Sequence, residues 1–261
     1  MINLKNKSII FTALLWLLAG SCFAQNNSDQ AENLMASRHR LDFSVSYMES
    51  FVDNSLDASL AYTYNLTLKT NISATVNYLD SRLGKEGSAG FGDTSLAFSW
   101  APTVDLSVAP WVPRKIGTGL GVVLPTGDAS DGRSLDSTIL VPFVGLVFPL
   151  KDTIFLYPTF TYLWSADKII TGEDVRIGVA DLGAGWVSPQ GFWITVYSAI
   201  VRDFVADDSH FNYQVSLGVP ISKQWSGSVD YVDSDFFLPG SDSDFGEAID
   251  KKFALSLHFN F

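Results

Sequence analysis

Strict alternation of apolar and polar residues constrains this chain more than any other feature. Between residues 56 and 67, every second side chain is apolar, and the residues between them are small or polar. The final stretch of the chain shows the same rhythm and ends on the aromatic residue Phe261. Because successive side chains of a β-strand point to opposite faces, each such stretch predicts a strand with one apolar and one polar face.

Twelve stretches of strand length can be recognised, and most of them alternate. They lie near 40–49, 56–67, 71–80, 92–102, 115–125, 137–148, 153–165, 173–187, 191–204, 210–219, 224–234 and 249–261. Most approach or exceed the roughly 9–11 residues that a tilted strand needs to cross a membrane. Their connections are alternately short and long, apart from a long one at 103–114, as in bacterial barrels. We therefore predict an all-β fold, a transmembrane antiparallel up-and-down β-barrel of about 12 strands over residues 40–261.

The polar face decides between a soluble barrel and a membrane barrel. It carries mainly Ser, Thr, Asn, Gln, Gly and Ala with few charges, whereas a water-exposed outer face usually has many Lys and Glu. Trp and Tyr, including Trp111 and Trp193, gather near predicted strand ends, where their rings suit the headgroup region. A last strand closed by Phe261 resembles the signature that the barrel assembly machinery reads in bacterial outer-membrane proteins. We therefore expect outer-membrane lipids as partners and the Gram-negative cell outer membrane as the location.

The first 24 residues predict a secretory signal peptide. Lys5 and Lys7 precede a short apolar run at 9–18, and small residues lead to a cleavage site after Ala24. The run is shorter than the roughly 20 residues of a membrane-spanning helix. Cys22 leaves a lipoprotein signal as an alternative, although the leucine usual three positions earlier is absent. Residues 25–39 would then form a periplasmic N-terminal segment.

The charge balance excludes one class of partner. The chain has 17 basic and 28 acidic residues, a net charge of −11, and the signal peptide contributes two of the lysines and no acid. Nucleic-acid binding requires basic patches that neutralise phosphates, so we expect no nucleic-acid partner. The acids concentrate between the alternating stretches, which indicates solvated loops.

Two short motifs carry a family resemblance. Gly92-Asp93-Thr94-Ser95 begins one predicted strand, and Leu124-Pro125-Thr126-Gly127-Asp128 ends the next. Together with the strand rhythm they resemble the barrel transporters grouped as the "MetA pathway of phenol degradation" family. The resemblance implies an outer-membrane channel for small molecules, with hydrophobic or aromatic solutes among the candidates.

The same residues also have a purely structural interpretation. Pro125, Thr126, Gly127 and Asp128 form a sequence suited to a tight strand exit, which we favour over a ligand-binding role. Three glycines on one face of the preceding strand, Gly117, Gly119 and Gly121, leave room in the lumen for a neighbouring side chain or mark a curved part of the wall.

Charges predicted to face inward are few: Asp42, Asp57, Asp93, Lys115, Arg176, Asp230 and Lys252. They either pair across the lumen, which we favour, or tune selectivity. We take Asp93, Arg176 and Asp230 as the candidates for a polar constriction. In 173–187 the apolar positions change from odd to even, which predicts a β-bulge near Ala180.

An enzyme is the least favoured class. Twelve-strand outer-membrane phospholipases use a Ser/His/Asn arrangement, but the three histidines here, His39, His210 and His258, are dispersed. Ser209 and His210 are sequence neighbours and so lie on opposite faces of a strand. We expect no catalytic residues, no metal site and no cofactor, with weak Ca²⁺ association left open for the Asp-rich stretch 233–244.

The sequence thus predicts a channel for passive movement of a small solute of unknown identity. Loops 81–91, 126–136 and 235–248 would gate its mouth, and Phe261 would serve insertion and closure. The alternative is a structural or interaction barrel without transport.

Overall fold

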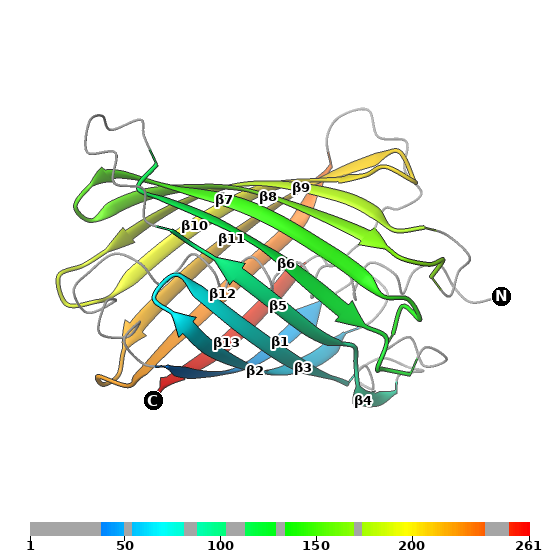
Figure 1. Ribbon diagram of the computed structural model, residues 1–261, viewed down its shortest axis with the longest axis horizontal. Coiled ribbons are helices and arrows are strands. Elements are labelled where there is room, and N and C mark those ends of the chain that lie inside the picture. Colours follow the sequence, from blue (N-terminus) through cyan, green and yellow to red (C-terminus); the bar gives the residue numbers. More distant parts are fainter. Residues whose placement is uncertain are drawn as a thin grey trace.

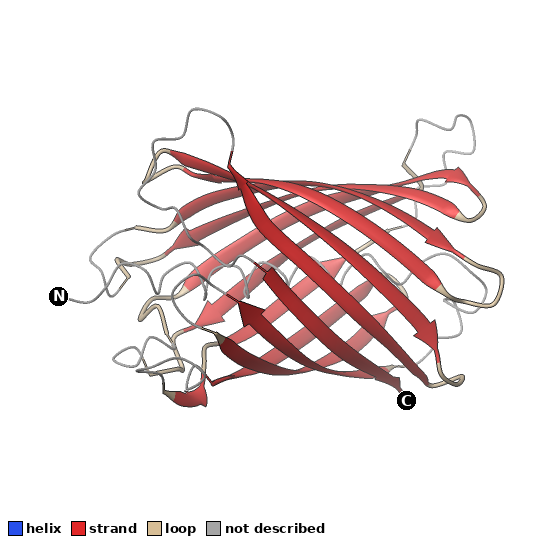
Figure 2. Cartoon of the chain, turned by 180° about the vertical axis from the view of Figure 1, so that it is seen from behind, coloured by secondary structure: helices blue, strands red, loops and turns tan. Residues whose placement is uncertain are grey.

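The computed structural model describes residues 38–49, 54–80, 88–102, 113–128, 134–169, 174–237 and 251–261. Within these ranges the chain is built of β-strands, turns and loops, without a helix (Figure 2). The strands are β1 (His39–Glu49), β2 (Ser55–Thr67), β3 (Thr70–Asp80), β4 (Ala89–Phe91), β5 (Thr94–Trp100), β6 (Lys115–Leu124), β7 (Ile139–Lys151), β8 (Ile154–Ser165), β9 (Arg176–Val187), β10 (Trp193–Asp203), β11 (Asp208–Pro220), β12 (Trp225–Phe237) and β13 (Lys251–Asn260).

The antiparallel strands form one sheet that closes on itself (Figure 1). The hydrogen-bonded order runs from β2 through β1 and β13 down to β5 and β3, and an additional pairing of β2 with β3 joins the two ends. Since β4 and β5 both pair with β3, they are two parts of one wall strand, interrupted at Gly92 and Asp93. The fold is therefore the predicted closed barrel of 12 wall strands. Closure matters because an open sheet edge in lipid would leave backbone groups without partners.

The two ends of the barrel differ. Tight turns join β2 to β3, β7 to β8, β9 to β10 and β11 to β12 at the end where the chain finishes at Phe261 (Figures 1 and 2). We call this the turn end and the opposite one the loop end. Each of the twelve predicted stretches overlaps an observed strand, so the alternating pattern located the wall correctly.

One detail of the predicted wall is wrong. β9 keeps an unbroken register with β8 and β10 through Ala180, so the predicted bulge is absent from it. Register shifts occur instead in β2 between Asn65 and Thr67, in β11 between Phe211 and Tyr213, and in β7 between Pro149 and Lys151. The change of phase in β9 has another cause, which lies inside the barrel and is described below.

The outer surface is apolar along the strands. Leu60, Phe98 and Leu255 are exposed on it, and Tyr47, Tyr62, Tyr78, Trp100, Trp164, Trp186 and Trp225 lie outward near strand ends. Such a surface with aromatic girdles suits a lipid environment. Trp193 differs because it faces inward, and Trp111 lies outside the described residues. The described residues contain no helix that is long and apolar enough to cross a membrane.

Candidate functional site in the barrel lumen

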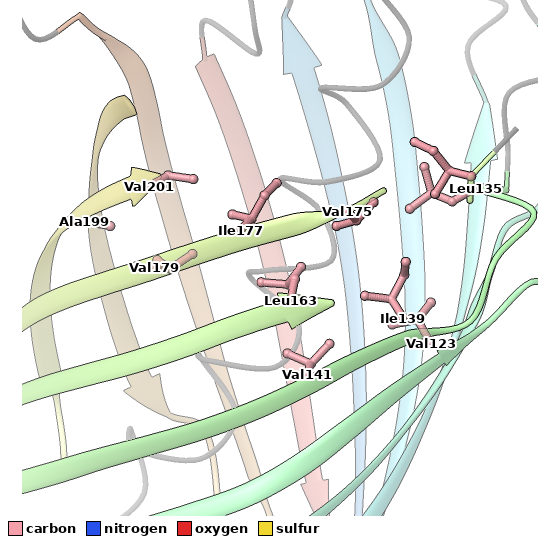
Figure 3. Close-up of a cluster of buried hydrophobic side chains, with 11 residues drawn as sticks. Val123, Leu135, Ile139, Val141, Leu163, Val175, Ile177, Val179, Ala199 and Val201 are labelled. Atoms are coloured by element: carbon pink, nitrogen blue, oxygen red, sulfur yellow. The ribbon is translucent and has the colours of Figure 1, made fainter. Parts of the chain in front are cut away.

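The lumen has one largely apolar side, formed by the inward faces of β6–β10, which we call the apolar wall, although the buried residues Thr161 and Thr195 also lie on it. At the loop end it holds a packed cluster whose members point into the barrel (Figure 3). The cluster consists of Val123, Leu135, Ile139, Val141, Leu163, Ile169, Val175, Ile177, Val179, Ala199 and Val201. Leu135 and Ile169 come from connections between strands, so the cluster joins the wall to its loops. Ile139 and Leu163 are 0 % exposed, which shows how closely this part of the mouth is packed.

Aromatic rings extend the apolar wall toward the turn end, and glycines make room for them. A Cβ at Gly119 would collide with the ring of Phe143, its direct partner across β6 and β7, and with the backbone carbonyl of Phe98. Gly183 is crowded in the same way by Tyr197, and Gly185 by Tyr157. The interpretation that Gly119 leaves room for a neighbouring side chain is therefore confirmed. Each ring lies over a strand where any larger residue would collide with it.

The remaining inward faces, from β11 to β13, β1 to β3 and β5, form the polar wall. Its buried polar side chains include Ser46, Asp57, Thr75, Ser95, Ser99, Asn212, Ser216, Ser226 and Lys252. Many carry hydroxyls, and these bond across the strands, as where Ser256 Oγ lies 3.0 Å from Ser44 Oγ. The barrel interior thus has two chemically distinct sides.

A charged group occupies the polar wall near the turn end. Arg40 Nε donates to Asp42 Oδ1 at 2.5 Å, and His258 Nδ1 lies 2.6 Å from the same oxygen. Arg40 Nη2 lies 3.1 Å from His258 Nδ1. His258 therefore faces the lumen, and the carboxylate of Asp42 is paired with its basic neighbours.

A second charged group lies further toward the loop end. Lys252 is buried, and the charges of Asp57 and Asp230 both act on its ammonium group. Asp230 also accepts hydrogen bonds from Gln214 Nε2 and Ser228 Oγ, each at 3.3 Å. Asp230, a sequence candidate for the constriction, thus faces the lumen as part of a mixed-charge group.

Asp93, a second candidate, has a different environment. It is buried, and its two carboxylate oxygens accept the backbone N–H groups of Gly127 and Leu135 at 3.1 and 3.2 Å. The Thr126 hydroxyl accepts the Thr94 backbone N–H at 2.9 Å and donates to the Gly92 carbonyl. The two motifs that stood apart in the sequence therefore bind each other, and Asp93 holds the loop that follows β6.

The Pro125–Asp128 motif begins where β6 ends at Leu124. Gly127 contributes its N–H to Asp93, and Asp128 has interactions of its own. This arrangement fits the structural interpretation of the motif. The gating segments can be located only in part, since 81–87, 129–133 and 238–250 lie outside the described residues.

Arg176, the third candidate, does not face the lumen, which corrects the prediction. Its side chain is 52 % exposed and pairs with Asp174 at 3.4 Å at the loop end. The apolar neighbours Val175 and Ile177 point inward into the cluster, so Arg176 points outward. The structure brings none of Asp93, Arg176 and Asp230 into contact with one another among the interactions of the described residues.

Sequence reasoning missed Asp181. It lies on β9 opposite Thr159, whose hydroxyl donates to Asp181 Oδ2 at 2.8 Å. The exposed residues Leu182 and Trp186 have the opposite parity, so Asp181 faces the lumen from within the apolar wall. After Ala180 the apolar residues Leu182, Ala184 and Trp186 occupy even positions, which places the odd-numbered Asp181 on the opposite face. The predicted bulge near Ala180 made the face of Asp181 ambiguous.

Phe261 lies where the first and last strands meet at the turn end (Figure 1). Its backbone exchanges hydrogen bonds with His39, and its ring stacks on those of His39 and Phe259 at 5.3 and 5.2 Å. The ring is about half exposed on the outer surface. Phe261 thus completes the β1–β13 closure, while its role as an insertion signal stays a prediction.

The remaining catalytic and metal candidates do not assemble in the described residues. Ser209 Oγ accepts a hydrogen bond from Arg202, and His39 lies against the Tyr62 hydroxyl. The described ranges hold no group of three or more His, Cys, Asp and Glu side chains suited to a metal ion. The stretch 233–244 lies mostly outside them, so Ca²⁺ association there stays an expectation.

Comparison with known proteins shows the fold. No family model matches the chain, and no curated protein matches it either. Among solved structures, the NanC porin matches with 10 % identity and a TM-score of 0.63 over 85 % of this chain and 100 % of that one. An outer membrane channel from Pseudomonas putida F1 matches with 11 % identity and a TM-score of 0.64 over 85 % and 94 %.

A more distant likeness is to the outer membrane phospholipase A from Escherichia coli, with 10 % identity and a TM-score of 0.50 over 88 % of this chain and 96 % of that one. The chain therefore has the porin-like fold of outer-membrane barrels. Membership of the phenol-degradation family implied by the two motifs has no support from these matches.

Proposed function

We propose that this protein is an outer-membrane channel through which small solutes, with hydrophobic or aromatic ones preferred, move passively down their gradient. The observation that carries the proposal is that apolar clusters and aromatic rings predominate along one side of the lumen. A barrel with a purely structural role needs apolar side chains inside only where they fill its interior. In barrel channels, the side chains that line the lumen tune selectivity.

Outer-membrane location belongs to the same proposal. It is supported by the closed sheet, the apolar outer surface and the likeness to outer-membrane barrels. In this setting the turn end faces the periplasm and the loop end faces outward, because bacterial barrels have short periplasmic turns. The lipids of that membrane and the barrel assembly machinery are then partners of the chain.

The two walls would act on different parts of a solute. Apolar groups gain about 25 cal/mol for each Å² removed from water, so an aromatic ring would follow β6–β10. The hydroxyl groups of the polar wall would form hydrogen bonds with the opposite side of the same solute. A solute can pass through the channel only if it binds weakly enough to be released. Several weak contacts along the apolar wall meet this need better than one deep pocket.

The test is conductance and solute flux with refolded full-length protein. Planar bilayers give the conductance, and swelling of liposomes gives the relative rates for L-phenylalanine and L-glutamine, which cross lipid poorly on their own. We expect conductance and faster entry of phenylalanine. Replacing Val141 with Thr should lower the phenylalanine-to-glutamine ratio, while the matched change Thr75→Val on the polar wall should leave it unchanged or raise it.

The second candidate is a barrel without transport, favoured by the close packing of the cluster at the loop end. Absence of both conductance and solute entry would support this role and overturn the channel. We infer no lipid-hydrolase role, because the Ser209 hydroxyl is engaged by Arg202 and His258 by Asp42. Hydrolysis of phospholipid by the refolded protein would contradict this inference.

A further inference from the structure

The inward carboxylates of the strands differ in what neutralises them. Asp42 is paired with Arg40 and His258. Asp57 lies in the field of Lys252, and so does Asp230, which also accepts two hydrogen bonds. In each of these cases a basic side chain of the polar wall acts on the acid, and Asp57 and Asp230 share one such residue, Lys252.

Asp181 is the exception. It stands in the apolar wall, where its hydrogen-bond partner is the uncharged hydroxyl of Thr159 at 2.8 Å. Across β10 its direct neighbour is Ala199, which contributes no polar side chain. No Lys, Arg or His pairs with Asp181 among the described residues. A half-buried carboxylate without a counter-charge is costly, because charges removed from water are normally paired.

An aromatic ring stands beside this carboxylate. Tyr197 lies over Gly183, two positions from Asp181 along β9, and a Cβ at Gly183 would come within 2.5 Å of the ring. Tyr197 as a whole is half-buried. The charges of Asp181 and Asp230 both act on its hydroxyl group.

A carboxylate and an aromatic ring on a largely apolar surface have one obvious common ligand. An ammonium group forms charge-assisted hydrogen bonds with a carboxylate and is attracted to the face of an aromatic ring. The attached apolar part of such a ligand would contact the surrounding wall. An anion would meet the negative charges of Asp181 and Asp230 instead.

We propose that Asp181 and Tyr197 form a binding site for organic ammonium ions on the lumen wall, with Thr159 orienting the carboxylate. The site deepens the proposed channel function by naming a solute class, amines with an apolar or aromatic body. The ammonium ion supplies the positive charge that no described residue places there.

The experiment uses the refolded full-length protein in detergent micelles and three probes of similar size, benzylammonium, benzyl alcohol and benzoate. Isothermal titration, corrected for protein-free micelles, gives the affinities. We expect wild type to bind benzylammonium most tightly. Asp181→Asn keeps the shape of the side chain and should weaken benzylammonium about tenfold or more, while binding of benzyl alcohol stays the same.

The matched control removes one negative charge elsewhere. Asp207→Asn changes an exposed turn residue whose positive φ of 57° asparagine also tolerates, and it should leave all three affinities unchanged. Tyr197→Leu should weaken benzylammonium about two- to fivefold, and Tyr197→Phe should not, since the ring face is kept. The heat-dependent shift in gel migration confirms that each variant is folded.

The outcomes separate the site from the channel. Equal affinity of wild type and Asp181→Asn for benzylammonium, or no preference for it in wild type, would overturn the site even if the protein conducts. Binding that depends on Asp181 in a protein without conductance would keep the site and reject the channel. Equal effects of Asp181→Asn on the amine and the alcohol would also count against the site.

Discussion

The two sides of the lumen hold the same backbone in place by different means. On the apolar wall, side chains pack closely against one another and exclude water, as in the cluster around Ile139 and Leu163. On the polar wall, hydroxyls and charges are matched pairwise, as in Arg40–Asp42–His258. The difference teaches that a barrel interior need not be uniformly polar. The apolar side is stabilised by close packing of its side chains. The polar side is stabilised by hydrogen bonds and by the pairing of its charged groups.

The largest expected effect comes from breaking a charge group of the polar wall. Lys252→Met should lower the free energy of unfolding by about 3–5 kcal/mol, because Asp57 and Asp230 lose the charge that balances them. Urea titration of refolded protein measures it. The double change Lys252→Met and Asp57→Asn should recover part of the loss. Lys251→Met, at an exposed neighbouring position, is the control and should have little effect.

Next in size is a shape change on the apolar wall. Gly183→Ala should cost about 1–3 kcal/mol, because the new methyl group collides with the ring of Tyr197 and the wall must adjust. Gly227→Ala is the matched control on β12, since its nearest neighbours would be 3.4 and 3.5 Å from the added carbon. Similar urea midpoints for the two variants would show that the rings are not seated on the glycines as described.

The smallest effect tests the contrast directly by exchanging one methyl group and one hydroxyl. Val141→Thr should destabilise the barrel by about 0.5–2 kcal/mol, because a hydroxyl enters the apolar cluster. Thr75→Val, the reverse change on the polar wall, should have a smaller effect. Equal losses in the free energy of unfolding for the two variants, measured with urea, would contradict the division of the lumen into an apolar and a polar wall.

The sequence predicted the wall because the lipid-facing residues alternate almost everywhere, and lipid imposes that pattern on every strand. It predicted the lumen less well where both faces of a strand are apolar. Around the start of β9, Val175, Ile177 and Val179 face the lumen, whereas the sequence pattern placed Arg176 there. The change of phase after Val179 was explained by a bulge, so Asp181 was not recognised as a lumen residue. Asp93 was recognised as inward-facing. Its hydrogen bond with the Leu135 backbone N–H joins residues 42 positions apart in the sequence, which no local pattern reveals.

The two hydrogen bonds of Asp93 have a mechanical consequence. They fasten the chain at Gly127 and again at Leu135, and Leu135 is in turn seated in the apolar cluster. A single carboxylate therefore couples the exit of β6 to the packed cluster, so a change at Asp93 would release both points together.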